Sequence, residues 1–552
     1  MTDSRDPWSA DLGDGHYMNP VIHADYSDPD VIRVGSDFFL VASSFNSIPG
    51  LPLLHSKDLV DWRIANHVIG RLGWPGYERP AHGKGVWAPS IRWRDGVYYV
   101  YFASPDEGVF MCRTEDPFGP WTAPLCVKRA IGWIDPCPFW DEDGNAYLVN
   151  AFANSRIGFK SVLRVSRMKG DGTGLLGEGR FVFDGQDSHP TMEGPKLYKR
   201  NGYYYIFAPA GGVENGWQTV LRSKDIFGPY RDKIVLHRGS TEINGPHQGA
   251  WVELESGESW FLHFQDKGPY GRVVHLQPME WVYDWPKVGI DFDNDGIGEP
   301  VERHRKPLVA TAAAVAIATT DLFDSPRLGR QWQWQADPVE GWFALRPDDG
   351  RLRLFGVPLP EVEAANMLDA PHILSQKFPA LAFSVETELA LGASGDGDEA
   401  GLIVLGREYH GIALRKSGDG FAVIRIEGSA RWDGRADPDP AGKTRRETAI
   451  ASATSSRIVL RLIVGEGAIC RLFYRLEGGT GEPGGAGEPG GAWAPAGDAF
   501  VASPGLWVGS KFGLYCLAAA ASATADARAR DAKPVNLEAA YADFGPVIVT
   551  KD

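Results

Sequence analysis

Apolar and polar positions follow one shared pattern in five segments of the first half of the chain. Each segment begins with a polar or small residue, continues as a short apolar run, and then makes a tight turn before an aromatic-rich stretch. Short apolar runs joined by Gly, Asp or Asn predict β-hairpins. The segments are DPDVIRVGSDFF from residue 28, APSIRWRDGVYY from residue 88, DPCPFWDEDGNAY from residue 135, EGPKLYKRNGYY from residue 193 and HQGAWVELESGESW from residue 247.

These five units recur at unequal steps, as expected for repeated β-sheets joined by loops of varying length. A repeat of this size that is built from hairpins predicts a β-propeller, here with five blades. Equivalent positions of the blades face a common axis. Residues that lie far apart in the sequence are therefore expected to converge in one funnel.

The first position of four units carries a residue that can do acid–base chemistry. These residues are Asp28, Asp135, Glu193 and His247, and the remaining unit has Ala88 at this place. The simpler interpretation is that the acids form turns, since Asp-Pro often begins a turn. That interpretation fits the two Asp residues taken singly but fits Glu193 badly. We therefore expect a joint catalytic site.

The second half of the chain has a different pattern, and we expect a β-sandwich there. Strand-length apolar runs alternate with Gly- and Pro-rich turns, which favours antiparallel sheets. The expected organisation is all-β, with a propeller over residues 1–308, a linker over 309–319 and a β-sandwich over 320–552. The runs are FSVETELAL, GLIVLGREYHGIALRK, GFAVIRIEG, RIVLRLIVGEGAICRLFYRLEG and GLWVGSKFGLYCLAA. We expect the low-complexity stretches 478–492 and 521–534 to be exposed loops.

Composition excludes several partner classes. A net charge of −15 in 552 residues argues against nucleic acid and anionic membranes as partners. The five Cys residues form neither a metal pattern nor a disulfide framework. The first 20 residues lack the features of a signal peptide, and no apolar stretch of about 20 residues could span a membrane. The expected location is the cytoplasm.

Several motifs in this order and spacing resemble glycoside hydrolase family 43, along nearly the whole chain. The motifs are YSDPDVIRVG, VWAPSI, WIDPCPF, TMEGPKLY, GPHQGAW and GRVVHLQPMEW. The resemblance implies a five-bladed propeller of the β-xylosidase and α-L-arabinofuranosidase type with a C-terminal β-sandwich. By matching position it implies that Asp28 is the general base, Asp135 the pKa modulator and Glu193 the general acid. It also implies that His247 is the axial His and that Arg272 binds sugar hydroxyls.

The chemistry of glycoside hydrolysis requires these residue types independently of the resemblance. Inversion needs one carboxylate to activate water and one carboxylic acid to protonate the leaving oxygen. Asp28 should therefore sit among donors or cations such as Arg272. Glu193 must keep its proton near neutral pH, and a neighbouring anion such as Asp135 favours that.

Other positions allow two interpretations. Trp87 and Phe45 are expected in the wall of a sugar pocket, or else in the packing between blades. Arg272 forms either an inner pair or a surface salt bridge, and the apolar run after it favours the inner pair. His247 is either a substrate contact, an interior His with hydrogen bonds, or, as the resemblance implies, a ligand of a hydrated axial calcium ion.

The stretch DFDNDGIGEPVE fits a calcium-loop pattern that offers Asp291, Asp293, Asp295 and Glu302 as ligands. The flanking helices of an EF-hand are missing, so a plain turn is the competing interpretation. The chemistry requires no cofactor, and calcium here would be structural.

The function expected from the sequence is an inverting exo-glycosidase that acts on β-1,4-xylo-oligosaccharides. α-L-Arabinofuranosidase activity is the near alternative, as a side activity or as the main one, with xylo- or arabino-oligosaccharides as the substrates. A retaining β-fructosidase fits poorly, because its Asn-Asp-Pro-Asn-Gly and Glu-Cys segments have no match here. A non-catalytic carbohydrate-binding propeller stays open, although the presence of all three acids argues against it.

Overall fold

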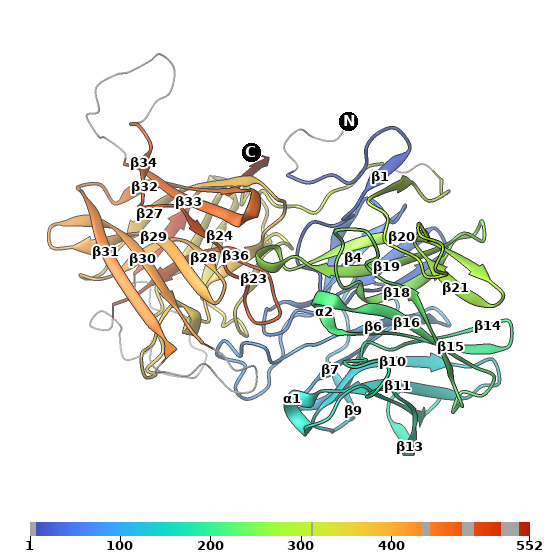
Figure 1. Ribbon diagram of the computed structural model, residues 1–552. Helices are drawn as coiled ribbons and strands as arrows, with labels where there is room; N and C mark the ends of the chain where they lie inside the picture. The colour runs from blue at the N-terminus through green and yellow to red at the C-terminus, as the bar shows by residue number, and fades with distance from the viewer. Residues whose placement is uncertain (1–6, 311–312, 432–441, 477–490, 520–539, 552) are drawn as a thin grey trace.

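The computed structural model describes residues 7–310, 313–431, 442–476, 491–519 and 540–551. It is all-β, with five four-stranded antiparallel sheets in the first half of the chain and two larger sheets in the second half (Figure 1). This architecture confirms the fold class predicted from the sequence. The predicted loops at 478–492 and 521–534 lie almost wholly outside the described residues.

The five sheets are the blades of a propeller, and in each blade the strands pair in chain order. The first blade is β2 (Asp30–Val34), β3 (Asp37–Val41), β4 (Gly50–Ser56) and β5 (Arg63–Ile69), and the second is β6 (Ser90–Arg94), β7 (Val97–Ser104), β8 (Gly108–Thr114) and β9 (Leu125–Lys128). The third blade is β10 (Trp133–Trp140), β11 (Ala146–Phe152), β12 (Val162–Met168) and β13 (Leu175–Asp184), and the fourth is β14 (Lys196–Arg200), β15 (Tyr203–Ala210), β16 (Trp217–Ser223) and β17 (Arg231–Leu236). The fifth blade is β18 (His247–Glu253), β19 (Ser259–Asp266), β20 (Arg272–Val282) and β21 (Trp285–Val288). Two short helices, α1 (Asn154–Ile157) and α2 (Gly212–Asn215), lie in loops of the third and fourth blades.

The first hairpin of each blade corresponds to one repeated unit of the sequence. Two of the hairpins turn on Asp95-Gly96 and Asn201-Gly202, and all four of these residues have positive φ. Asn-Gly and Asp-Gly suit such two-residue turns because Gly, Asn and Asp tolerate the left-handed conformation at the least cost. The local sequence therefore fixes where the inner strands of the second and fourth blades end.

The inner strands of the blades are neighbours around the axis. Strand β2 contacts β6 and β18, and β10 contacts β6 and β14. Contacts between the first and fifth blades close the ring. Apolar residues fill the spaces between blades in several buried clusters; the cluster between the fifth and first blades includes Trp260, Leu40 and Leu262. The starts of all five inner strands are thereby brought to one end of the axis.

The second half of the chain forms two packed sheets. One has the order β23 (Gln333–Trp334), β26 (Leu374–Lys377), β36 (Lys511–Leu517), β28 (Glu399–Leu405), β29 (Glu408–Ser417), β30 (Gly420–Ser429) and β31 (Thr444–Ala453). The other contains β24 (Phe343–Arg346), β25 (Arg351–Phe355), β37 (Tyr541–Phe544), β27 (Phe383–Gly392), β32 (Arg457–Gly465), β33 (Ile469–Leu476) and β34 (Ala494–Pro495), with β35 (Phe500–Val501) on β33 and β38 (Ile548–Lys551) on β27. A further pair joins β1 (His16–Met18) to β22 (Arg303–Arg305).

The propeller and the sandwich share an extensive interface. Tyr270 and Val273 of the fifth blade belong to the buried apolar cluster of the sandwich. The Tyr270 hydroxyl donates to the Leu381 carbonyl at 2.8 Å and accepts from the Ala468 amide at 2.8 Å. Because such contacts bury propeller side chains inside the second domain, the two domains stabilise each other.

In the part of the chain that the structure describes, no helix has the length and apolar character needed to cross a membrane.

Candidate active site

The four marked residues lie where the inner strands begin. Asp28 precedes β2 by two residues, Glu193 precedes β14 by three, and His247 is the first residue of β18. Asp135 lies within β10, at a shift in register between Ile134 and Cys137. The sequence repeat and the inner ends of the strands therefore coincide.

Two of the acids adopt an unusual backbone conformation. Asp28 has a φ of 56° and Asp135 a φ of 55°, in the left-handed region. A non-glycine residue there costs roughly 1–2 kcal/mol, although Asp tolerates it better than most. Such strain is common at functional sites, where it turns a side chain to a required direction.

Asp28 is held by three donors. The Ser27 and Ser43 hydroxyls donate to its Oδ2 at 2.8 and 2.6 Å. Arg272 donates to Oδ1 at 3.2 Å and to the Ser27 hydroxyl at 2.7 Å. The Arg272 side chain is 11% exposed, and its guanidinium lies 4.8 Å from the centre of the Phe264 ring. Arg272 thus forms an inner pair with Asp28 and not a surface salt bridge.

Glu193 and Asp135 are linked through one backbone amide. The Gly194 N–H donates to Asp135 Oδ2 at 2.7 Å, which fixes the residue after Glu193. The pKa of Glu193 is raised from 4.5 to about 8, first by burial and then by the charges of Asp135 and Asp28. The pKa of Asp135 is raised from 3.8 to about 7, first by burial and second by the charge of Asp28. The hydrogen bond from Gly194 lowers this pKa and so opposes the shift. Glu193 therefore keeps its proton to higher pH than Asp135, and burial is the larger cause.

His247 contacts Glu193 as a neutral imidazole. Its Nε2 lies 3.5 Å from Glu193 Oε1, and its side chain is 1% exposed. Burial, then the charge of Arg272, lowers the pKa of His247 to about 3. The contact is therefore not an ion pair, and neither ring nitrogen has a hydrogen-bond partner among the described residues.

Aromatic side chains from both domains meet beside the first two blades. Phe45 and Trp87 have ring centres 6.2 Å apart. Trp507, from the sandwich, packs edge-on against Trp87 at 4.9 Å and lies 6.2 Å from Phe45. Phe45 and Trp87 thus lie together, and their role as the wall of a sugar pocket stays a prediction. No local pattern in the sequence marks Trp507, so its place beside Phe45 and Trp87 was not predicted.

Two further buried groups near the acids were also missed. Ser43, which holds Asp28, stands in VASSFNS among several other Ser residues that give no distinguishing signal. Lys196 is fully buried and donates to the Pro89 carbonyl at 2.7 Å and to Ser90 Oγ at 2.9 Å. Its charge lowers the pKa of Asp135 and so partly opposes burial. The sequence signal that could have pointed to Lys196 is its place directly after Gly-Pro in the repeated unit that begins at Glu193.

The acidic loop after β21 brings together three of its four predicted ligands. Possible ligand atoms of Asp291, Asp293 and Asp295 all lie within 4.8 Å of one another. Glu302 is not part of this group, because backbone hydrogen bonds between Ile290 and Glu299 close the loop before residue 302 is reached. Its role as a ligand stays a prediction. Within the described ranges, no group of three or more possible ligands includes His247.

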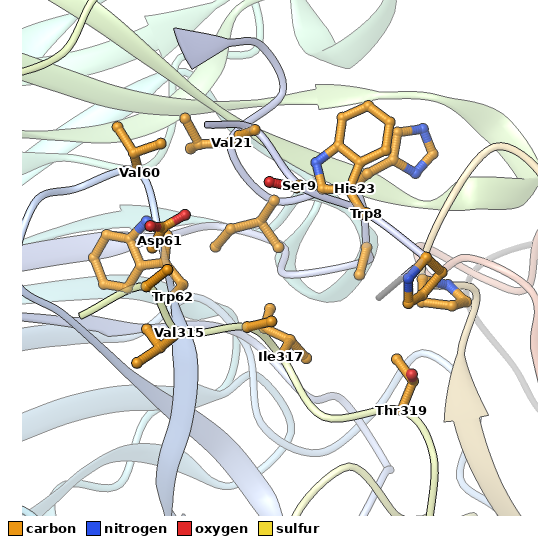
Figure 2. Close-up of a pocket in the computed structure, with 17 residues that line it drawn as sticks. Trp8, Ser9, Val21, His23, Val60, Asp61, Trp62, Val315, Ile317 and Thr319 are labelled. Carbon is orange, nitrogen blue, oxygen red and sulfur yellow. The ribbon is translucent and has the colours of Figure 1, made fainter. Parts of the chain in front are cut away.

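A cavity of about 240 Å³ lies away from these acids, between the N-terminal segment and the segment that leads to the sandwich. Figure 2 shows Trp8 and His23 on one side of it, with Trp62 and Ile317 around the rest. None of the predicted catalytic residues lines it.

Comparison with known proteins places this architecture in a family. Residues 17–286 match the model for glycosyl hydrolases family 43, and residues 320–528 match the β-xylosidase C-terminal concanavalin A-like domain. A protein from Xylanibacter ruminicola that is provisionally named a β-xylosidase is 44% identical over 409 residues, which are 74% of each chain. A β-xylosidase from Formosa agariphila is 36% identical over 374 residues, which are 62% of each chain.

A third relative and a solved structure extend the comparison. A non-reducing end α-L-arabinofuranosidase from Bacteroides ovatus is 29% identical over 76% of this chain and 80% of its own. The crystal structure of a xylan β-1,4-xylosidase from Bacillus halodurans superposes with a TM-score of 0.79 at 22% identity, covering 97% of this chain and all of that one. That structure supports the fold alone. The two family matches and the 44% identical relative together establish that this chain is a glycoside hydrolase and belongs to family 43.

Proposed function

We propose that this enzyme is an inverting exo-β-xylosidase that releases xylose from the non-reducing end of β-1,4-xylo-oligosaccharides. The observation that carries the proposal is the contrast between two acids. Asp28 is held by three donors, whereas burial and neighbouring carboxylates raise the pKa of Glu193 to about 8. One site thereby provides a base, which must be ionised, and an acid, which must be protonated.

In this mechanism Asp28 accepts a proton from water as the water attacks the anomeric carbon. Glu193 donates its proton to the glycosidic oxygen, which leaves with the rest of the chain. Arg272 and Ser27 fix the carboxylate of Asp28, and the Gly194 amide and Asp135 fix the segment that carries Glu193. Positioning of this kind lowers the barrier because the reacting groups need no rearrangement.

The neutral His247 suits a role in sugar binding. Its ring nitrogens are without hydrogen-bond partners among the described residues, and Nε2 lies beside Glu193. A buried polar group without a partner costs about 1–3 kcal/mol. A sugar hydroxyl that bonds to this nitrogen would remove the cost on binding and would place the substrate against the acid.

The exo mode is supported by the aromatic group of Phe45, Trp87 and Trp507. A wall made from both domains favours a pocket that admits one chain end over a cleft open at both sides, and aromatic faces suit the apolar face of a pyranose. The names of the more similar relatives support xylose as the preferred sugar. The name of the Bacteroides relative supports α-L-arabinofuranosidase activity as the alternative.

One set of measurements tests the proposal. Aryl β-xyloside, α-L-arabinofuranoside and β-fructofuranoside should be compared as substrates, with proton NMR of the first product. We expect the β-xyloside to be cleaved fastest and to release α-xylose before mutarotation. Asp28→Ala and Glu193→Ala should each nearly abolish cleavage in folded protein. Initial release of β-xylose would contradict the inverting mechanism. Wild-type rates in Glu193→Ala would contradict its assignment as the general acid. A folded wild-type protein that cleaves none of the three substrates would favour a binding propeller.

The acidic loop could hold a cation, and we propose that calcium there would be structural. Carboxylate oxygens at alternate positions of a loop are the ligands that calcium prefers. Asp291, Asp293 and Asp295 supply such oxygens at the end of the last blade. Their place after β21, and not at the start of an inner strand, separates them from the reacting groups.

A further inference from the structure

Asp25 lies three residues before Asp28 and joins the two domains with one carboxylate. Its Oδ1 accepts the Arg272 backbone N–H at 2.9 Å, and its Oδ2 accepts the Gly509 N–H at 3.0 Å. Arg272 begins β20 of the fifth blade, whereas Gly509 belongs to the sandwich and precedes β36. The side chain is 3% exposed. Both carboxylate oxygens are thus used across a domain boundary.

Two glycines allow this junction to close. A Cβ on Gly271 would lie 2.5 Å from Asp25 side-chain atoms, and a Cβ on Gly509 would lie 2.7 Å from the Gly271 backbone N. No real side chain tolerates such distances. Gly271 also has a φ of 74°, which favours glycine. The backbones of the two domains are therefore in direct contact at Asp25.

Each end of the junction leads to the active site within two residues. The Arg272 backbone is held by Asp25, and its guanidinium donates to Asp28 and Ser27. Trp507 is two residues before Gly509 and packs against Trp87. Trp507 has a φ of 62°, an unusual conformation for a bulky residue that surrounding contacts must maintain.

Asp25 is also the acid that faces two half-buried lysines. Burial lowers the pKa of Lys377, and Asp25 opposes that shift. Burial and Lys377 lower the pKa of Lys511 to about 7, again against Asp25. The Lys511 ammonium donates to the Ser47 hydroxyl, and Lys377 lies 5.1 Å from the centre of the Tyr26 ring. Loss of the Asp25 charge would leave these two cations without their compensating acid.

We propose that Asp25 is a positioning residue that sets Arg272 on the catalytic base and Trp507 on the pocket wall at the same time. Through it the sandwich domain controls the geometry of a reaction that occurs in the propeller. This inference rests on the proposed role of Asp28 as the base and extends it to the second domain.

The test compares Asp25→Asn with Asp337→Asn in the full chain. Asp337 is a matched control, because it is also 3% exposed and also joins the domains by two backbone bonds, from Leu72 at 2.8 Å and Gly73 at 2.6 Å. Asp337 also lies 3.8 Å from Arg71, and among the described residues it has no hydrogen bond or ion pair with Arg272 or Trp507. We expect Asp25→Asn to lower kcat/KM on an aryl β-xyloside by at least about tenfold, with both a lower kcat and a higher KM. Asp337→Asn should stay within about threefold of wild type.

Two further readouts separate positioning from general stability. Hydrogen exchange should speed up at Arg272 and Gly509 in Asp25→Asn, and at Leu72 and Gly73 in the control. Trp507→Ala should raise KM less in the Asp25→Asn background than in wild type, because the two changes disturb one contact. Should Asp25→Asn fail to fold, Asp25→Glu keeps the charge and displaces the carboxylate, and we expect the same kinetic loss.

Wild-type kinetics in folded Asp25→Asn, or an equal loss in Asp337→Asn, would overturn the inference. Unchanged exchange at Arg272 and Gly509 would overturn it as well. A wild-type enzyme that does not cleave β-xylosides would instead contradict the proposed function, and the exchange experiment would still decide whether Asp25 joins the two segments.

Discussion

Replacing Asp135 by Asn should move the alkaline limb of the pH–rate profile to lower pH. As the proposed general acid, Glu193 works only while protonated, so kcat/KM should fall as pH rises through its pKa. That pKa is raised to about 8 by burial first and by Asp135 second. Asn removes the charge, and its carbonyl oxygen can still accept the Gly194 N–H that Asp135 now accepts. Burial remains, so the limb should stay well above the ordinary value of 4.5.

The size of the shift follows from the electrostatics. At an effective dielectric constant of about 20, two unit charges at about 4 Å interact by about 4 kcal/mol, and the interaction falls to about 2–3 kcal/mol when the charges are not in direct contact. At 1.36 kcal/mol per pKa unit this corresponds to about 1.5–2 units. The pKa of Asp135 is itself raised to about 7, so its charge is incomplete near neutral pH. We therefore expect a shift of about one unit.

The assay is kcat/KM against pH for two aryl β-xylosides. Phenyl β-xyloside has a poor leaving group and should report the full shift, whereas a dinitrophenyl xyloside needs little protonation and should report less. Asp141→Asn is the control, because Asp141 follows the other end of β10 and pairs with Lys199 at 2.6 Å. An unchanged limb, a shift to higher pH, or an equal shift in the control would refute the reasoning.

Three further predictions concern stability. The pKa of Glu193 in the folded protein is raised above its unfolded value, so the contribution of Glu193 to stability is present below about pH 4.5 and is lost as pH rises toward 8. Glu193→Gln should therefore raise Tm at neutral pH and leave Tm almost unchanged near pH 4. A chain ending at residue 306 should aggregate or lose most activity, because Tyr270, which is buried against the sandwich core, would be exposed; a soluble and fully active fragment would contradict this. Calcium should raise Tm and EDTA should lower it if the acidic loop is filled, since a ligand that binds the folded state stabilises it; Asp293→Ala with Asp295→Ala should abolish the response, and a wild-type Tm that ignores both additives would favour a plain turn.

Much of the fold and of the acid set follows from local sequence patterns. The hairpins are encoded by short apolar runs and by turns such as Asp95-Gly96, whose conformation depends on a few neighbouring residues. Because each blade repeats the same unit, the position of one acid predicts the equivalent positions of the others. Asp28, Asp135 and Glu193 were found in this way. The linker at 309–319 and the exact domain boundaries stay predictions.

The acidic loop marks a first limit of such patterns. The spacing of DFDNDGIGEPVE pointed to Glu302, but the backbone pairing of Ile290 with Glu299 closes the loop earlier. A spacing rule assumes the loop geometry of the proteins in which it was observed. Here the chain pairs at Ile290 and Glu299, and the possible ligands that lie together are the three Asp residues without Glu302.

Tertiary structure alone decided which sandwich residues lie beside the candidate active site. Asp25 and Gly509 are bonded although 484 residues separate them, and Trp507 reaches Trp87 across the same boundary. Hydrophobic periodicity reports which face of a strand is buried, because that depends on neighbours along the chain. It does not report which loops of two domains meet, because docking depends on shape, on charge and on many weak contacts summed over both surfaces. The sequence by itself determined the fold class and singled out the candidate acids, and the docking of the domains determined how those side chains are held.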